Sequence, residues 1–181
     1  NISTTQTIRG NRALPQFPEL DEDDPMFEFF KRFIPRQSPG MPREFQHKSL
    51  GSGFIISQAG YILTNAHVVG LAEDVRLLDR HGTDLTALVI ARDPVRDVAV
   101  LSVPEGAQGL QVAPATPELG DEVFALGAPL GIDFTLTEGR ISTLARQVEI
   151  AVPILMLQHD AAVNPGSSGG PLVDAEGRLL G

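Results

Sequence analysis

The chain has 181 residues, which is enough for one sizeable domain or two small barrels. With 18 glycines, 14 prolines, one tyrosine and no tryptophan, the composition favours a turn-rich β protein over a helical bundle. The net charge of −9 argues against a nucleic-acid-binding surface, and the absence of cysteine excludes a disulfide framework and a thiolate metal site. No apolar run approaches the roughly 18 residues that a membrane span needs.

The first part of the chain predicts one short strand and a long loop. Residues 1–7 are polar and β-branched, and we expect a strand there. Residues 8–48 contain many prolines and an acidic cluster but little periodicity, which is typical of a long loop insertion. Within this loop, residues 26–33 are rich in phenylalanine and could form a short amphipathic helix.

From Gly51 onward the pattern indicates many short strands separated by turns that carry Gly, Pro or Asp. We expect strands at 54–56, 61–64, 74–78, 84–91, 97–103, 121–126, 133–137, 139–146, 149–158 and 171–173. Strands at this spacing favour a sandwich or a barrel over alternating β/α units.

The segment Asn164–Pro171 places two serines among glycines, between two apolar runs. Such a turn can expose a nucleophilic hydroxyl beside backbone N–H groups that stabilise an oxyanion, although a plain Gly/Ser turn has the same composition. The pattern G-x-S-x-G also occurs in α/β-hydrolases, whose histidine follows the serine. No histidine follows Ser168 as far as Gly181, so that fold is disfavoured.

His67 is the strongest candidate for a general base, because it ends an apolar strand and opens a turn. A satisfied core histidine is the alternative, and His159 is the rival base. Asp97 heads an apolar strand, where a charge needs a partner, and it could orient the histidine. Asp93 is a rival, but it precedes a proline, as is typical of a turn. Asp160 is another, but it follows His159, and adjacent residues in a strand point to opposite faces.

The order His67, Asp97, Ser168 is that of the chymotrypsin-like proteases and differs from the order in subtilisin. The segments that carry these residues resemble the three catalytic blocks of the HtrA (Deg) serine proteases. They are Thr64–Val69 (TNAHVV), Arg96–Leu101 (RDVAVL) and Asn164–Leu172 (NPGSSGGPL). Two further segments, Gly51–Ile56 (GSGFII) and Ala125–Gly131 (ALGAPLG), match the same family, and its bacterial periplasmic members are the most similar.

The resemblance implies an all-β, chymotrypsin-like double β-barrel spanning residues 1–181 as one trypsin-like protease domain. The first barrel would extend to about residue 105 and the second would cover about 110–181, with 8–48 as a regulatory loop insertion. We expect the second barrel to be truncated at Gly181 and PDZ domains to follow it. No signal peptide is visible in this chain, and one could have been removed.

The resemblance also assigns roles to residues. Ser168 would be the nucleophile, His67 the base and then the acid, and Asp97 the orienting carboxylate. The N–H groups of Gly166 and Ser168, together with that of Ser167, would form the oxyanion hole. Asparagine usually stands before the catalytic serine in the family, so Ser167 is a second candidate nucleophile, but the register with the following glycines favours Ser168.

Two further assignments concern specificity and assembly. Val163 matches a position that lines the S1 pocket, which implies small or medium apolar P1 side chains. In related proteins aromatic residues of the long loop can block a neighbouring subunit in a resting oligomer. The residues that would do so here are Phe27, Phe29, Phe30 and Phe33.

The function implied is ATP-independent endoproteolysis of unfolded or misfolded polypeptides in the periplasm, by a trimer or a multiple of trimers. No cofactor and no metal ion are expected, because the histidines and carboxylates lack ligand spacing. The alternative is a chaperone or peptide-binding protein on the same fold with a silenced triad.

Overall fold

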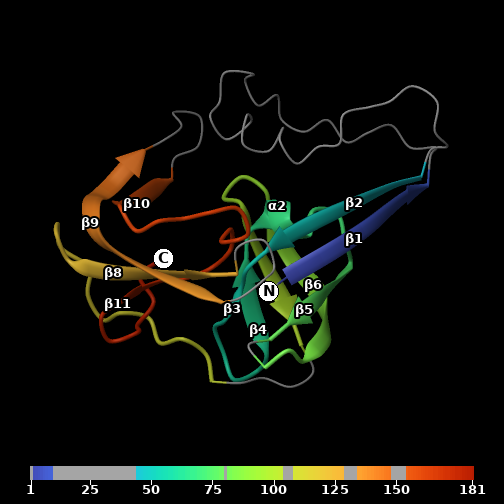
Figure 1. Ribbon diagram of the computed structural model, residues 1–181, viewed down its shortest axis with the longest axis horizontal. Coiled ribbons are helices and arrows are strands. Elements are labelled where there is room, and N and C mark those ends of the chain that lie inside the picture. The colour runs from blue at the N-terminus through green and yellow to red at the C-terminus, as the bar shows by residue number, and fades with distance from the viewer. Residues whose placement is uncertain (1, 10–43, 80, 104–107, 129–133, 148–153) are drawn as a thin grey trace. The chain divides into compact units, whose positions relative to one another are not determined.

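The computed structural model describes residues 2–9, 44–79, 81–103, 108–128, 134–147 and 154–181 (Figure 1). The chain divides into one compact unit of residues 1–6 and 47–181 and a second of residues 7–46. The four phenylalanines assigned to the regulatory loop, Phe27, Phe29, Phe30 and Phe33, and the short helix expected at 26–33 lie outside the described residues.

The first half of the described chain forms a seven-stranded sheet in the order β2-β1-β5-β6-β7-β4-β3. Its strands are β1 (Ile2–Arg9), β2 (Glu44–Gly51), β3 (Phe54–Ile55), β4 (Tyr61–Thr64), β5 (Asp74–Leu78), β6 (Asp84–Asp93) and β7 (Val98–Ser102). A single turn of helix, α2 (Ala66–Val69), follows β4 directly. Neighbouring strands from β5 to β3 pair antiparallel.

The second half forms a four-stranded antiparallel sheet in the order β10-β9-β8-β11. Its strands are β8 (Glu122–Gly127), β9 (Thr135–Gln147), β10 (Leu155–His159) and β11 (Leu172–Asp174). Both sheets curl, as Figure 1 shows for β9, and the described chain has almost no helix. The prediction of an all-β, chymotrypsin-like fold is confirmed.

Each sheet has its own apolar core. In β5, buried Val75 and Leu77 alternate with exposed residues, as expected for a strand with one face toward a core. The first core contains Ile2, Ile62, Ala66, Val68, Val69, Val75, Leu77, Ala87, Ala99, Leu101 and Val103. The second contains Val123, Ile141 and Leu172, with Ala125, Leu157 and Leu180 packed against it.

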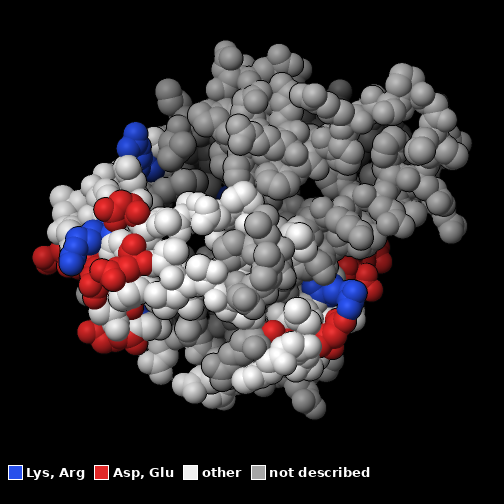
Figure 2. All heavy atoms as spheres, in the orientation of Figure 1, with Lys and Arg blue, Asp and Glu red and all other residues white. Residues whose placement is uncertain are grey.

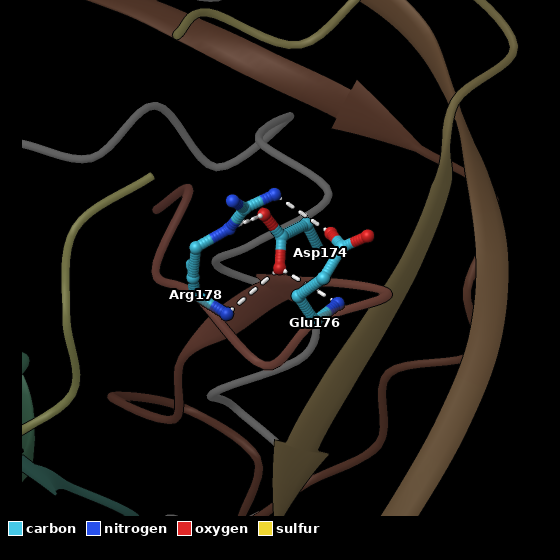
Figure 3. Close-up of polar contacts among 3 residues, drawn as sticks. All are labelled: Asp174, Glu176 and Arg178. Carbon is cyan, nitrogen blue, oxygen red and sulfur yellow. Dashed lines mark hydrogen bonds and ion pairs between the residues drawn. The ribbon is translucent and has the colours of Figure 1, made fainter. Parts of the chain in front are cut away.

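After β11 the chain turns back on itself around one carboxylate. Asp174 accepts hydrogen bonds from the backbone N–H groups of Glu176 (3.0 Å) and Arg178 (2.8 Å) and from the guanidinium of Arg178 (2.7 Å), as Figure 3 shows. Arg178 also pairs with the Glu176 carboxylate at 2.7 Å. The turn returns the chain alongside β11, where Val173 pairs with Leu179.

Several predicted boundaries differ from the structure. Strand β2 begins at Glu44, inside the range expected to be loop, and the two strands expected at 133–137 and 139–146 are the single strand β9. The prediction broke the strand at Glu138, but β9 continues there, and the adjacent Gly139 pairs with Val123 and lies so close to Ala161 that a Cβ has no room. Strand β10 begins only at Leu155, and residues 148–153 lie outside the described part.

Charged side chains are spread over the described surface. On the face drawn in Figure 2, acidic groups gather toward two sides with basic groups among them, and a largely uncharged area lies between. Examples of such mixed charge are the ion pairs Arg96–Asp93 (2.7 Å) and Arg178–Asp174 (2.7 Å). None of the described helices is long and apolar enough to cross a membrane.

Candidate active site

The register of β4 and β7 brings His67 and Asp97 together. Thr64 in β4 lies opposite Ala99 in the antiparallel strand β7. Residues just after Thr64 therefore lie beside residues just before Ala99. The Nδ1 atom of His67 is 2.6 Å from Oδ2 of Asp97, and the backbone N–H of His67 donates to Oδ1 at 2.9 Å.

The contact between the two side chains defines the histidine tautomer. A carboxylate is an acceptor only, so Nδ1 of His67 carries the proton that is donated to Asp97. In the neutral imidazole, Nε2 then presents its lone pair on the opposite edge of the ring. This is the state in which a histidine can accept a proton from a hydroxyl.

Asp97 has an unusual backbone conformation. Its φ of 53° is the one positive value among the described residues other than glycine. Such a conformation costs of order 1–3 kcal/mol and persists only where neighbouring groups hold it. Here the carbonyl of Asp97 accepts hydrogen bonds from Asn65 Nδ2 (2.8 Å) and from the N–H of Ala66 (3.2 Å). Asp97 was expected to start the strand, but it lies one residue before β7.

The turn that carries Ser168 packs against the same part of the first sheet. The carbonyl of Ser168 accepts a hydrogen bond of 2.7 Å from the backbone N–H of Ser52. A Cβ at Gly169, whose φ is 82°, would lie 3.0 Å from the backbone nitrogen of Asn65, two residues before His67. The described residues therefore bring the turn next to the start of α2.

The two candidate nucleophiles have different surroundings. The side chain of Ser167 lies against the end of β8, since a Cβ at Gly127 would be 2.7 Å from its Oγ. The carbonyl of Ser167 accepts a hydrogen bond from Gly170 (2.8 Å), and its N–H donates to Asn164 (2.9 Å). Ser167 therefore packs on the second sheet.

The rival acidic residues are engaged elsewhere. Asp93 closes a turn by accepting hydrogen bonds from the N–H groups of Val95 and Arg96 and from the Arg96 side chain. The Arg96 side chain, helped by these backbone N–H groups, lowers the pKa of Asp93. Asp160 accepts a hydrogen bond of 2.6 Å from the N–H of Arg140 in β9.

The remaining predicted residues lie around this turn or apart from it. Gly166 has a φ of 98°, and Val163 is exposed just before the turn. His159 lies in β10, and its buried Nδ1 has no hydrogen-bond partner among the described residues. Those residues contain no group of three or more His, Asp or Glu side chains that could hold a metal ion.

Ser52 is the residue that sequence reasoning missed. It was noted only as part of the Gly51–Ile56 segment, but its side chain is 4% exposed and its hydroxyl contacts the backbone of Gly166 and of Ala128. The available signal was a small polar residue between two glycines where the chain turns from one strand into the next. That signal does not indicate which distant groups the hydroxyl meets.

Comparison with known proteins shows the family of this chain. Residues 51–181 match the family model of the trypsin-like peptidase domain. The chain is 43% identical over 190 residues to a protein of Pseudomonas putida (strain GB-1) named "Probable periplasmic serine endoprotease DegP-like"; the match covers 100% of this chain and 39% of that protein. The chain therefore spans well under half the length of this curated relative.

Solved structures give the same result. An HtrA-type protease, AlgW, determined with a decapeptide, matches 99% of this chain and 52% of its own at a TM-score of 0.75 and 32% identity. A serine endoprotease from Yersinia pestis matches 74% of this chain and 47% of its own at a TM-score of 0.64 and 38% identity. With a trypsin-like family match over 51–181 and HtrA proteases as relatives in both sequence and structure, this chain belongs to the trypsin-like serine peptidases, in the HtrA (Deg) family.

Proposed function

We propose that the chain is the protease domain of an endopeptidase that cleaves peptide bonds through an acyl-enzyme at Ser168. One observation carries the proposal: Asp97 holds both the ring and the backbone N–H of His67, and the Ser168 turn packs beside the segment that carries this histidine. A histidine held by a carboxylate beside a serine is the arrangement that activates a hydroxyl nucleophile.

The reaction would proceed in two halves. Ser168 Oγ attacks the scissile carbonyl carbon, and its proton passes to Nε2 of His67. The C–N bond then breaks, the proton moves to the departing amine, and the acyl group stays on Ser168. Water attacks this ester and gives a proton to His67. The acid product then leaves, and Ser168 takes the proton back.

The oxyanion of each tetrahedral intermediate needs hydrogen-bond donors. The N–H groups of Gly166 and Ser168 are the proposed donors. The N–H of Ser167, which the sequence also suggested, donates to the Asn164 carbonyl at 2.9 Å. Val163 is the proposed lining of the S1 pocket. Its exposed, uncharged side chain suits small or medium apolar P1 residues.

The proposed substrates are unfolded or misfolded polypeptides, a substrate class that rests on the family resemblance. The proposed location is the periplasm, as the names of the Pseudomonas relatives state for those proteins. Trimeric assembly and a regulatory role for residues 8–48 belong to the same proposal and rest on the family resemblance. A chaperone with a silent triad is the alternative, and no contact described above favours it.

Active-site labelling tests the proposal. The full-length protein is treated with a biotinylated fluorophosphonate, with and without an unfolded substrate such as reduced casein, and the labelled peptide is sequenced by mass spectrometry. We expect label on Ser168, casein cleavage, and loss of both in Ser168→Ala. Ser167→Ala is the matched control and should keep most of the label.

Two outcomes would contradict the proposal. Absence of label with substrate present would favour the non-proteolytic alternative. Label on Ser167 that survives in Ser168→Ala would show that the neighbouring serine is the nucleophile. Loss of label in both variants with normal thermal unfolding would leave Ser168 as the nucleophile and give Ser167 a supporting role.

A further inference from the structure

Ser52 is a buried hydroxyl that joins the two sheets. It lies between β2 and β3, and it is one of two buried polar residues in the described chain, the other being Thr64. Its Oγ donates to the carbonyl of Gly166 at 2.7 Å and accepts from the N–H of Ala128 at 2.9 Å. Its own N–H donates to the carbonyl of Ser168 at 2.7 Å.

Both partners of the Ser52 hydroxyl are backbone groups, one half-buried and one buried. Without the hydroxyl they would lose this hydrogen bond. A serine hydroxyl offers one donor and two acceptor positions. Ser52 uses the donor on Gly166 and one acceptor position on Ala128. An unpaired buried backbone group costs about 1–3 kcal/mol, so both groups are held firmly in place.

These contacts bear on the peptide planes that would form the oxyanion hole. The peptide between residues 166 and 167 is held at both ends, by Ser52 at its oxygen and by the Asn164 carbonyl at its N–H. The next peptide is held at its oxygen by the N–H of Gly170. A trans peptide points its N–H opposite to its C=O. The Ser168 N–H is therefore directed away from the hydrogen bond between the Ser167 carbonyl and Gly170.

Ser52 thus binds the turn on both sides of the Ser168 N–H, at the carbonyls of Gly166 and Ser168. The φ of 98° at Gly166 is open to glycine and strained for other residues, so the turn has no intrinsic preference that would hold it there. The restraint on Gly166 comes from the hydroxyl of a residue 114 positions earlier.

We propose that Ser52 is a positioning residue for the oxyanion hole: its hydroxyl fixes the peptide between Gly166 and Ser167, which lies between the two peptides that carry the proposed donors, the N–H groups of Gly166 and Ser168. This inference rests on the proposed function. Ser52 touches no reacting atom and leaves the His67–Asp97 pair unchanged. Its removal should therefore impair transition-state binding and spare ground-state binding of substrate.

The test compares Ser52→Ala with wild type in the full-length protein. Loss of one direct oxyanion donor costs about 10²–10³ in kcat. An indirect loss should be smaller, and we expect kcat to fall about tenfold to a hundredfold with KM within about twofold. Affinity for a peptide boronate, which forms a tetrahedral adduct with Ser168, should fall by the same factor. Affinity for the same uncleaved peptide, measured in a Ser168→Ala background, should not change.

Ser57→Ala is the matched control, since the Ser57 hydroxyl is buried but has no hydrogen-bond partner among the described residues. It should keep wild-type kcat. Ser52→Thr keeps the hydroxyl and should recover part of the activity. Where Ser52→Ala does not fold, Ser52→Cys fills nearly the same space with a weak donor and should lose kcat in the same way, to a lesser extent.

The pH profile separates positioning from a general loosening of the site. Because Ser52 does not touch the histidine, the pH dependence of kcat/KM should keep its midpoint in Ser52→Ala. Unchanged kcat in Ser52→Ala would overturn the proposal. So would equal losses of peptide and boronate affinity, because these would show that the whole cleft had changed. Absence of wild-type labelling and cleavage in the same assay would overturn the proposed function itself.

Discussion

At the scale of single residues, Asp97 combines a strained backbone with a carboxylate that is used twice. Its two oxygens contact the ring and the backbone N–H of His67, and its carbonyl accepts two hydrogen bonds from Asn65 and Ala66. The same three-residue segment thus holds both ends of the aspartate. The strain at Asp97 is balanced by contacts that also set the histidine tautomer.

Asp97→Asn tests this role with little change in shape. An amide in place of the carboxylate can donate to Nδ1, which would favour the wrong tautomer of His67 and take away the lone pair on Nε2. We expect kcat/KM for a peptide substrate to fall by about 10³–10⁴-fold with thermal unfolding little changed.

The matched control for this change is Asp93→Asn, four positions earlier. Asp93 caps a turn and contacts Arg96, so this variant should lose some stability and keep its catalytic rate per folded molecule. Equal losses of kcat/KM in the two variants would contradict the assignment of Asp97.

At the scale of elements, the glycine-rich turn before β11 is held by close packing against the first sheet. Gly169 has a φ of 82°, and a Cβ there would meet the carbonyl of Ser52 and the hydroxyl of Thr64. Thr64 in turn donates to the Ser52 carbonyl at 2.7 Å. The turn therefore sits where the end of β4 and the β2–β3 connection meet.

Gly169→Ala and Gly82→Ala form a pair that separates backbone strain from packing. Gly82 has nearly the same φ, 81°, but a Cβ there would meet nothing within 4 Å. Both variants should lose about 1 kcal/mol from the left-handed conformation. Gly169→Ala should lose substantially more and also lose activity. Urea unfolding and peptide cleavage measure both quantities, and equal stability losses would show that the turn can move freely away from Thr64.

The turn after β11 should make stability depend on pH. Partial burial opposes ionisation of Asp174, but hydrogen bonds from the backbone and side chain of Arg178 outweigh it and lower the pKa of Asp174 below its usual value. A carboxyl whose pKa is lower in the folded state adds stability above the unfolded pKa of about 4, and this stability is lost as pH falls through the folded pKa.

Asp174→Asn should therefore be less stable than wild type near neutral pH, and the difference should shrink as pH falls below about 4. Urea unfolding at several pH values measures it. Glu176→Gln is the control, because it removes an exposed ion pair with Arg178 and leaves the backbone hydrogen bonds to Asp174 in place. A difference for Asp174→Asn that is constant with pH would show that the carboxylate charge adds nothing.

A strand could be predicted from the sequence where only one of its two faces is buried. In β5 the alternation of Val75 and Leu77 with polar residues gave both ends of the strand correctly. The single strand β9 was divided in error at Glu138, one residue before Gly139, whose missing side chain allows Ala161 to approach. The strand β2 was missed because the polar residues before Leu50 show no such alternation.

At the scale of the whole molecule, the site draws on both sheets and both cores. His67 lies in α2, directly after β4 of the first sheet, and Asp97 directly before β7 of the same sheet, whereas Ser168 precedes the last strand of the second sheet. The sequence could predict that His67, Asp97 and Ser168 form one candidate site, because each lies in a short motif that is recognised without the rest of the fold. The link through Ser52 could not be predicted, since it depends on how Gly166 and Ala128 fold back onto a residue far away in the chain.

The core of the first sheet should determine stability more than the site does. Leu101 is fully buried in this core, so Leu101→Ala should destabilise the protein by about 2–5 kcal/mol. Leu88, which is 61% exposed, is the control, and its replacement by Ala should change stability by less than about 0.5 kcal/mol. Denaturant unfolding measures both. Similar values would show that β7 is not central to the core.

The hydroxyl of Ser52 has a consequence for recombining relatives of this chain. Both of its partners are main-chain groups, so the link requires glycine at position 166, where φ is 98°, and any residue except proline at position 128, and it makes no other demand on those side chains. A chimera that joins residues 1–103 from one homologue to 104–181 from another should therefore preserve it, provided that the donor of the first half has serine at this position. The choice of crossover point is then limited by whether the backbone keeps its path at residues 128 and 166. Differences in sequence elsewhere in the second half should leave the Ser52 link intact.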